Sequence, residues 1–519
     1  MTNTSARLPT TEPQDTERLP RLLRAMGAIE RVGNALPHPF WLFWILAIAL
    51  GLASAILSWT DVSVTSPADG KVVEIHNLFS GAGLQMAVST AIDNFAEFPP
   101  MATIVVVIMG VALAERTGFL QAVMRVSISR VPTSMIVFAV AFAGTMAHVA
   151  SAAAYVILVP LGGLAFRAVG RSPILGIVVA YTAIASGYDA SPIPTPNDAI
   201  FAGITTAAAK TIDPEAYVSP LSNWFFNIAS SIVLATVITV VTKLVLSRRS
   251  DLEPDADADL GDIKDLQIDR KERRALRIAG LSLLAAIAVL VIILIPQSSP
   301  LRGEHGSLTD SPFLDGIAMI VAALFALTGI IYGGMTGSLR KPGDVPKMMA
   351  EGIRQMAPVL VLFFAIAQFL AYFDWTGVGD LVSAASARAL GDLGAPPVVL
   401  FLGILLALTI INLLVTSGSA MWSLTAPILV PMMLLLHVPA ETTQALFRIA
   451  DSGSTAITPM SPYFVMALGF LQRYRKSAGV GTLASYTIPL AISMTVTWTV
   501  LFLVWWALGI PLGPGAPVR

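Results

Sequence analysis

The sequence of 519 residues contains no cysteine, only five histidines and only 13% charged residues. The absence of cysteine excludes disulfides, thiolate metal sites and a cysteine nucleophile. Soluble domains carry about 25% charged side chains, whereas 55% of this chain is hydrophobic. Such a chain has too few polar side chains to cover itself in water. We therefore predict an all-α polytopic membrane protein.

An excess of charge of either sign is also missing. The 32 lysines and arginines nearly balance the 33 aspartates and glutamates, which leaves a net charge of −1. Because nucleic-acid binding requires a clear basic excess, we expect no nucleic-acid partner. The sequence has no HExxH metal motif, no GxSxG elbow and no Walker-A loop. We therefore expect neither an enzyme nor an ATP-driven pump, and no cofactor or bound metal.

Long apolar stretches predict about nine transmembrane helices, since a helix needs about 20 mostly apolar residues to cross a bilayer. The first stretch is not followed by a small-residue cleavage site, so we interpret it as a span rather than a signal peptide. Four further stretches are shorter or interrupted, at 133–147, 152–166, 420–436 and 462–471. The predicted spans are 40–59, 98–114, 173–187, 222–246, 277–296, 313–334, 357–373, 396–416 and 484–509.

The basic residues of the loops predict the orientation, because cytoplasmic loops are enriched in lysine and arginine. The N-terminal tail, 1–38, contains five arginines and is expected in the cytoplasm. Residues 60–97 contain five acidic residues and only one lysine, and they are expected outside. Arg130 and Arg167 lie on the same side by this rule, which predicts a re-entrant hairpin over 133–166. The C-terminus is expected in the periplasm.

One polar segment divides the chain into two halves. Residues 247–275 contain an acidic run followed by the basic sequence RKERRALR, and we interpret them as a cytoplasmic linker. The first transmembrane half then covers 39–246 and the second covers 276–511, followed by a C-terminal tail at 512–519.

The two halves contain matching fragments in the same order. SAAAYVILVP at 151–160 matches SAMWSLTAPILVP at 419–431, and DASPIPTP at 189–196 matches DSGSTAITP at 451–459. Repeats of this kind, which we expect to be inverted, are common in secondary transporters. They predict a second re-entrant hairpin at 420–437.

The proline-containing fragments cannot continue as regular helices, because proline lacks an N–H and clashes with the preceding turn. We predict unwound stretches at 189–197 and 452–459, close to the two hairpin tips. Free backbone groups at membrane depth are tolerated only where a cavity, a substrate or an ion satisfies them. These stretches therefore indicate a binding site.

Arg448 and Asp451 lie three residues apart, which places them on one face of a helix. One interpretation is a salt bridge between the two that only neutralises buried charges. The other is that Arg448 binds a substrate carboxylate through its planar fork, while Asp451 carries a proton or an ion. The sequence alone leaves both open.

Three further titratable residues of the first half are candidates for ion or proton coupling. Asp189 and Asp198 flank the first unwound stretch, and Asp198 could also simply cap the helix that follows. His148 lies beside the predicted hairpin turn. It is either a hydrogen-bonded structural residue or a group that titrates near neutral pH.

Polar residues also gather around the second predicted hairpin. Asn412 precedes it, and Ser417, Gly418 and Ser419 form a plausible tip. A helix that starts there would direct the positive end of its dipole at an anion. Trp422 is either an interfacial anchor or, as its apolar surroundings favour, a stacking surface for an aromatic ligand.

Several of these segments resemble the p-aminobenzoyl-glutamate transporter (AbgT) family over nearly the whole chain. The resemblance rests on SGSAMWSLTAPILVPM and ALFRIADSGSTAITPMSPYF, and on AYVILVPLG, NDAIFAGIT and SPLSNWFF in the first half. It implies a homodimer in the bacterial inner membrane, with nine transmembrane helices and two re-entrant hairpins in each protomer. It also implies import of p-aminobenzoyl-glutamate or export of sulfonamide antimetabolites, driven by a proton or ion gradient. The functional positions that it implies are Asp198, Asn412, Ser419, Trp422, Arg448, Asp451 and Pro459.

The chain departs from the family pattern in the first half. The usual acid of the first hairpin is missing at Ala152, and Asp189 stands where the family tends to have a serine. The coupling ion, a proton or sodium, and the substrate are therefore left open. The alternative within the same class is a sodium-coupled carrier of dicarboxylates or other organic anions. A passive channel fits the paired broken helices less well.

Overall fold

The computed structural model describes residues 37–60, 63–65, 72–129, 131–150, 153–258, 268–308, 311–392, 394 and 396–519. Most of the predicted N-terminal tail and Ala152 lie outside the described residues. Within them, the chain is helical apart from a two-stranded antiparallel ribbon of β1 (Ser63–Thr65) and β2 (Val72–Glu74).

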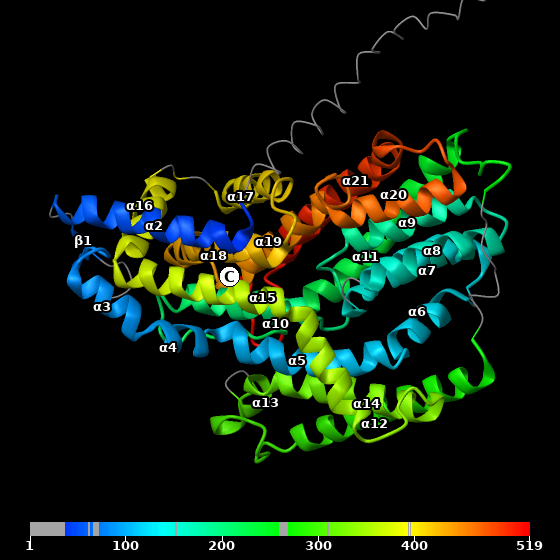
Figure 1. Cartoon of the computed structure of the whole chain (residues 1–519), viewed down its shortest axis with the longest axis horizontal. Coiled ribbons are helices and arrows are strands. Elements are labelled where there is room, and N and C mark those ends of the chain that lie inside the picture. The colour runs from blue at the N-terminus through cyan, green and yellow to red at the C-terminus, as the bar shows by residue number, and fades with distance from the viewer. Residues whose placement is uncertain are drawn as a thin grey trace, which may run out of the picture.

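The helices form two successive halves (Figure 1). Short 3-10 turns, η1 (Thr133–Met135) and η2 (Ala147–Ala150), flank α7. The first half contains α2 (Pro39–Ser58), α3 (Gly81–Ser89), α4 (Ala91–Ala96), α5 (Pro99–Arg116), α6 (Phe119–Ser129), α7 (Ile136–Met146), α8 (Ala153–Ala168), α9 (Pro173–Ala185), α10 (Pro196–Ala209) and α11 (Trp224–Leu244). The second contains α12 (Arg270–Leu294), α13 (Pro312–Asp315), α14 (Ile317–Thr336), α15 (Asp344–Trp375), α16 (Val378–Asp392), α17 (Pro397–Asn412), α18 (Gly418–Leu435), α19 (Ala440–Thr455), α20 (Pro462–Tyr474) and α21 (Val480–Leu508).

Among the described residues, nine helical segments are long and apolar enough to cross a membrane, which agrees with the predicted number. Two of the nine segments are not the ones that were predicted to cross the membrane. The predicted spans 173–187 and 396–416 are the shorter helices α9 and α17, whereas 133–150 and 418–435 reach spanning length. Apolar content alone could not separate these cases, because both kinds of helix are equally apolar and only their ends differ.

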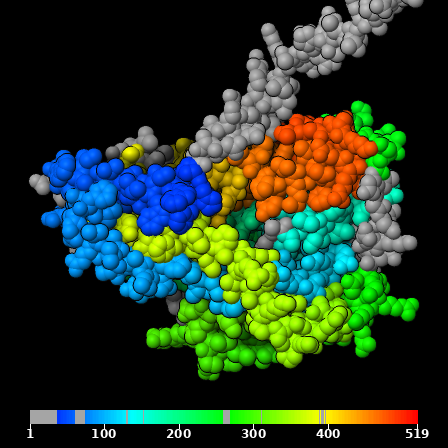
Figure 2. All heavy atoms as spheres, viewed as in Figure 1, coloured from blue at the N-terminus to red at the C-terminus, as the bar shows by residue number. Residues whose placement is uncertain are grey.

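The apolar surface expected of a membrane protein is exposed in rows. On α21, Ile492, Val496 and Val500 are each more than half exposed and recur every four residues, so they share one helix face. Helices α2, α15 and α20–α21 lie on the face shown in Figure 2. Such rows match a lipid-facing surface rather than a water-facing one.

The repeat appears in how the halves pack on each other. Helix α10 of the first half packs on α18 and α19 of the second, while α20 of the second packs on α8 and α9 of the first. Each half therefore packs one helix against both the hairpin and the broken helix of the other half. Reciprocal packing of this kind is expected of two repeats related by a pseudo-two-fold axis.

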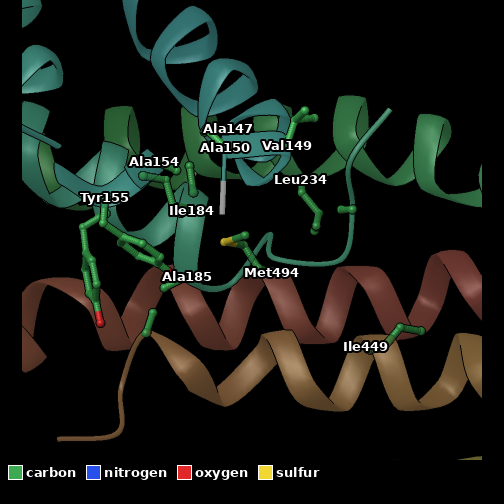
Figure 3. Close-up of a cluster of buried hydrophobic side chains, with 14 of the residues drawn as sticks. Ala147, Val149, Ala150, Ala154, Tyr155, Ile184, Ala185, Leu234, Ile449 and Met494 are labelled. Carbon is green, nitrogen blue, oxygen red and sulfur yellow. The ribbon is translucent and has the colours of Figure 1, made fainter. Parts of the chain in front are cut away.

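The predicted hairpin at 133–166 is present as α7, the turn η2 and α8. Its tip is buried: Ala147, Val149 and Ala150 pack near Ile184 of α9 and Met494 of α21 (Figure 3). Helices α8 and α9 approach each other closely because each has a glycine at the contact, Gly162 on α8 and Gly176 on α9. A Cβ built on Gly162 would lie 2.7 Å from the carbonyl oxygen of Gly176. Small residues at such interfaces allow close helix packing in membranes.

The prediction of a helical hairpin at 420–437 is wrong in its boundaries. Residues 418–435 form the single helix α18, and the turn lies earlier, at 413–417, between α17 and α18. Pro427 and Pro431 lie inside α18 without ending it. Prolines are tolerated in helices of membrane proteins where neighbours satisfy the freed backbone groups. The second hairpin is therefore α17–α18, which corresponds to α7–α8 in the first half.

The two broken stretches are present, with the boundaries of both corrected. The first break covers 186–195 between α9 and α10 rather than 189–197, since α10 already starts at Pro196. The second break covers 456–461 rather than 452–459, since α19 continues to Thr455. A proline prevents the hydrogen bond to the residue four positions earlier. Pro459 therefore ends the helix at Thr455 and leaves the preceding turn intact.

One other predicted boundary changes, and the C-terminal tail is packed. The linker ends at Asp269 rather than at residue 275, because Asp269 and Glu272 form a capping box that starts α12 within the charged run. The C-terminal segment 512–519 packs against the transmembrane helices. The backbone N–H of Phe226 donates to the carbonyl oxygen of Leu512 at 3.1 Å, and Thr442 Oγ1 donates to that of Val518 at 2.9 Å.

Candidate functional site

Arg448 lies on α19 in a closed ion-pair cluster. Its Nη2 is 2.7 Å from Asp198 Oδ1, and its Nε donates to Asn223 Oδ1 at 3.0 Å. The side chains of Arg448 and Asp198 are only 1% and 6% exposed. The structure therefore pairs Arg448 with an aspartate of the other half, rather than with Asp451 on its own helix.

Asp198 serves two groups at once. Its Oδ2 accepts hydrogen bonds from the backbone N–H and the hydroxyl of Thr195, at 2.6 and 2.8 Å. This capping box starts α10, as the sequence allowed. The other oxygen of Asp198 contacts Arg448. The carboxylate thus fixes the N-terminus of α10 against α19.

Trp422 is fully buried beside this cluster. Its Nε1 donates to Thr205 Oγ1 at 2.9 Å, and its ring stacks on Phe447 with 4.5 Å between the centroids. Neither sequence-based interpretation describes this position. The indole is too deeply buried for an interfacial anchor, and its face is already occupied by Phe447.

Asp451 lies one turn after Arg448 and meets a second acid. The carboxyl groups of Asp451 and Asp189, which come from the two different halves, lie close enough to share a hydrogen bond when one of them is protonated. Ser452 Oγ donates to Asp189 Oδ2 at 3.4 Å and accepts from the backbone N–H of Asp189 at 3.1 Å. The other oxygen, Asp189 Oδ1, has no partner among the described residues. The sequence suggested both acids without indicating that they meet.

The N-terminus of α18 lies directly against Asp451. A Cβ built on Gly418 would lie 2.6 Å from Asp451 Oδ2, so the carboxylate rests where only glycine leaves room. Ser417 caps this helix, and the positive end of the helix dipole favours an anion there. Asn412 does not face the ligand space: its Nδ2 donates to the backbone carbonyl of Asp451 and, at 2.8 Å, to Ser454 Oγ.

A cavity of about 610 Å³ opens beside Asp451. It is bounded by α5 and α15 and by the N-terminal residues of α8, α10, α18 and α20. Of the predicted site residues, Ser417, Gly418, Ser419 and Asp451 line it. The described lining residues do not include Asn412, Trp422, Arg448, Pro459, Asp189, Asp198 or His148.

Sequence analysis missed most of the cavity wall. Glu115, Asn197 and Gln355 contribute polar groups, and three tyrosines form an aromatic side. The tyrosines could have been noticed from their places in the motifs, because Tyr155 follows the SAAA sequence and Tyr463 follows the second broken stretch. Glu115 ends an apolar span, where a lone acid is not distinctive.

His148 lies in the buried tip of the first hairpin. Its Nε2 is 2.7 Å from the carbonyl oxygen of Ile184, and its ring contacts Tyr188 with 3.8 Å between the centroids. The structural interpretation of a hydrogen-bonded histidine therefore describes it. Among the described residues, no group of three or more His, Asp or Glu side chains is placed to hold a metal ion.

Paired broken helices, reciprocal packing of two repeats and a cavity with a buried acid define a membrane transporter built from two repeats. A profile described as the AbgT putative transporter family matches residues 24–519, and the chain belongs to this family. The chain is 36% identical over 492 residues to the p-aminobenzoyl-glutamate transport protein of Escherichia coli, covering 94% of this chain and 96% of that one.

Two solved structures have the same fold. The YdaH transporter of Alcanivorax borkumensis is 36% identical, with a TM-score of 0.87 over 92% of this chain and all of that one. MtrF of Neisseria gonorrhoeae, described among antimetabolite efflux pumps, is 37% identical, with a TM-score of 0.90 over 95% of this chain and all of that one. The predicted family, the all-helical membrane fold and the transporter function are thereby confirmed.

Proposed function

We propose that this transporter carries a small aromatic amide acid of the p-aminobenzoyl-glutamate kind, together with a proton. The substrate class follows the name of the Escherichia coli relative. The observation that carries the coupling is the adjacent, buried pair of Asp189 and Asp451, joined through Ser452, one member of which lines the cavity.

Two adjacent carboxyl groups away from bulk water cannot both be ionised without strong repulsion. One proton between Asp189 and Asp451 leaves a single negative charge, which the N-terminus of α18 stabilises. A second proton makes the pair neutral. An anionic substrate beside Asp451 is repelled by the charged pair and accepted by the neutral one. Proton and anion therefore bind cooperatively, which is the linkage that co-transport requires.

The substrate carboxylate is bound by helix N-termini in this proposal. Among the described lining residues there is no lysine or arginine. The first residues of α8, α10, α18 and α20 all line the cavity, or lie next to residues that do. Each helix start carries about half a positive charge. Arg448 acts indirectly, because it holds Asp198 and with it the start of α10.

The test is uptake of radiolabelled p-aminobenzoyl-glutamate into proteoliposomes under a proton or a sodium gradient imposed separately. We expect accumulation with the proton gradient, and its loss in Asp451→Asn. Asp213→Asn, which changes an exposed loop acid, is the matched control. Proton uptake on substrate binding, followed with a pH indicator in weak buffer, should accompany binding by the wild type.

Each other outcome has a defined meaning. Accumulation driven only by sodium would support the organic-anion carrier alternative. Proton release on binding would support exchange, as expected of an exporter of sulfonamide antimetabolites. Uptake without stimulation by substrate on the opposite side would indicate a channel. Normal accumulation by Asp451→Asn would remove the carboxyl pair as the coupling site.

We further propose that the protein is a homodimer in the bacterial inner membrane with its N-terminus in the cytoplasm. The family likeness and the basic N-terminal tail support this arrangement. Light scattering of the purified protein and protease access to the N-terminal tail in oriented vesicles test the two parts separately.

A further inference from the structure

Two tyrosine rings from different halves stack at the cavity. Tyr155 of α8 and Tyr463 of α20 lie parallel, with 4.1 Å between ring centroids and 4° between ring planes. Both line the cavity, as does Tyr188 from the first broken stretch. Tyr155 is fully buried, whereas Tyr188 and Tyr463 are half-buried and leave part of their rings exposed to the cavity.

The stack is held by ring contact. The hydroxyl of Tyr155 has no hydrogen-bond partner among the described residues, although it is buried. Because this hydroxyl makes no hydrogen bond, which costs stability, only contacts with neighbouring rings fix the position of the Tyr155 ring. The Tyr155 ring is supported by Tyr463 on one side, with Tyr181 at 6.2 Å and His148 at 6.1 Å between centroids.

Resting on the proposed function, we infer that Tyr188 and Tyr463, with Tyr155 stacked behind Tyr463, form the subsite for the substrate's aromatic ring. A substrate ring that stacks on Tyr463 extends the stack that Tyr463 already forms with Tyr155. Because the Tyr463 ring is already held in place, binding loses little of its conformational entropy. Aromatic pairs add about 0.5–1.5 kcal/mol beyond the burial of their area. The subsite adjoins Ser417–Ser419 and Asp451, so a ring and a carboxylate of one small molecule reach both.

The subsite replaces the one suggested by Trp422. The indole of Trp422 is fully buried, donates to Thr205 and stacks on Phe447. A ligand ring would have to displace Phe447 to reach it. The tyrosine wall already faces the cavity and requires no such displacement.

The experiment compares two ligands that differ only in aromaticity, benzoyl-glutamate and cyclohexanecarbonyl-glutamate. Equilibrium binding to the purified transporter is measured by competition with radiolabelled p-aminobenzoyl-glutamate. We expect the wild type to prefer the arene by about 2- to 12-fold, which is the range that aromatic pairing corresponds to. Tyr463→Leu should reduce this preference to about 1, while Tyr463→Phe should keep it.

Tyr217→Leu, which changes an exposed loop tyrosine, is the control and should keep the full preference. Because the readout is a ratio of two ligands, a general loss of affinity or of folded protein does not imitate the effect. If Tyr463→Leu fails to fold, the wild-type ratio and a Tyr188→Leu variant decide the question. An unchanged ratio in Tyr463→Leu, or no arene preference in the wild type, overturns the subsite. If the wild type binds neither ligand, it is the proposed substrate class that fails.

Discussion

Two buried polar clusters lie within one turn of α19 and differ in their charge balance. The cluster of Arg448, Asp198 and Asn223 has opposite charges in contact and is closed from the cavity. The cluster of Asp451 and Asp189 contains two acids, and one of them lines the cavity. The first is a balanced ion pair that joins the two halves, while the second has an excess negative charge that the N-terminus of α18, a proton or a ligand can offset. Adjacent residues of one motif can therefore have separate tasks.

The largest effect should come from breaking the balanced cluster. Arg448→Ala leaves the carboxylate of Asp198 buried without its cation, which typically costs about 3–5 kcal/mol. We expect most of the folded protein to be lost, measured by thermal unfolding and size-exclusion chromatography. Arg448→Ala combined with Asp198→Ala should recover a substantial part, because neither charge is then unpaired.

A contrary result would change the assignment of this cluster. If Arg448→Ala is as stable as the wild type but no longer binds carboxylated substrates, Arg448 contacts the substrate directly in another state of the transport cycle. The two clusters would then not differ in the way we describe.

At the cluster of Asp451 and Asp189, transport should depend on the close fit between Gly418 and the Asp451 carboxylate. Gly418→Ala introduces a Cβ 2.6 Å from Asp451 Oδ2, so the carboxylate or the start of α18 must move. We expect gradient-driven uptake to fall about tenfold or more, as small misplacements at functional groups commonly do. Gly403→Ala on α17 meets no atom within 4 Å and is the matched control. Equal uptake by both variants would show that the fit between Gly418 and Asp451 is unimportant.

Removing the second acid should alter pH dependence more than rate. When the neutral pair loses its first proton, the protonated carboxyl of Asp189 stabilises the charge on Asp451 by hydrogen bonding. The amide in Asp189→Asn is a weaker donor than a carboxylic acid, so Asp451 keeps its proton to a higher pH. We expect the fall of uptake with rising pH to begin at a higher pH, with the maximal rate changed by less than about tenfold. An uptake profile that matches the wild type between pH 5 and pH 8 would separate Asp189 from coupling.

The smallest effect should come from a salt bridge at the linker. Arg249 Nε and Nη2 each donate to Asp251 at 2.9 Å and lower the pKa of this carboxyl. Because the pKa of Asp251 is lower in the folded state than its unfolded value of about 3.9, the ionised carboxylate stabilises the fold at pH values above about 3.9. This stabilisation is lost as the pH falls through the folded-state pKa. Asp251→Asn should therefore cost about 0.5–1 kcal/mol at neutral pH. Its melting temperature should approach that of the wild type only in strong acid.

Local patterns predicted seven of the nine spanning segments, the repeated fragments and the first hairpin, because apolar runs and prolines act on nearby backbone. They misplaced the second hairpin, since Pro427 and Pro431 look like breaks yet lie inside α18. The pairings of Arg448 with Asp198 and of Asp451 with Asp189 join distant segments. No local pattern encodes such contacts. The tyrosine wall was missed for the same reason, because its rings meet only after the two halves pack.

The packed C-terminal segment also bears on how the protein is made. Leu512 contacts the start of α11, and Val518 contacts Thr442 at the start of α19, the helix that contains both clusters. During synthesis, these contacts become available only after α21 has emerged from the ribosome. The contacts at the start of α19 are therefore completed last, and a chain that stops after α21 lacks two hydrogen bonds that hold the first turns of α11 and α19.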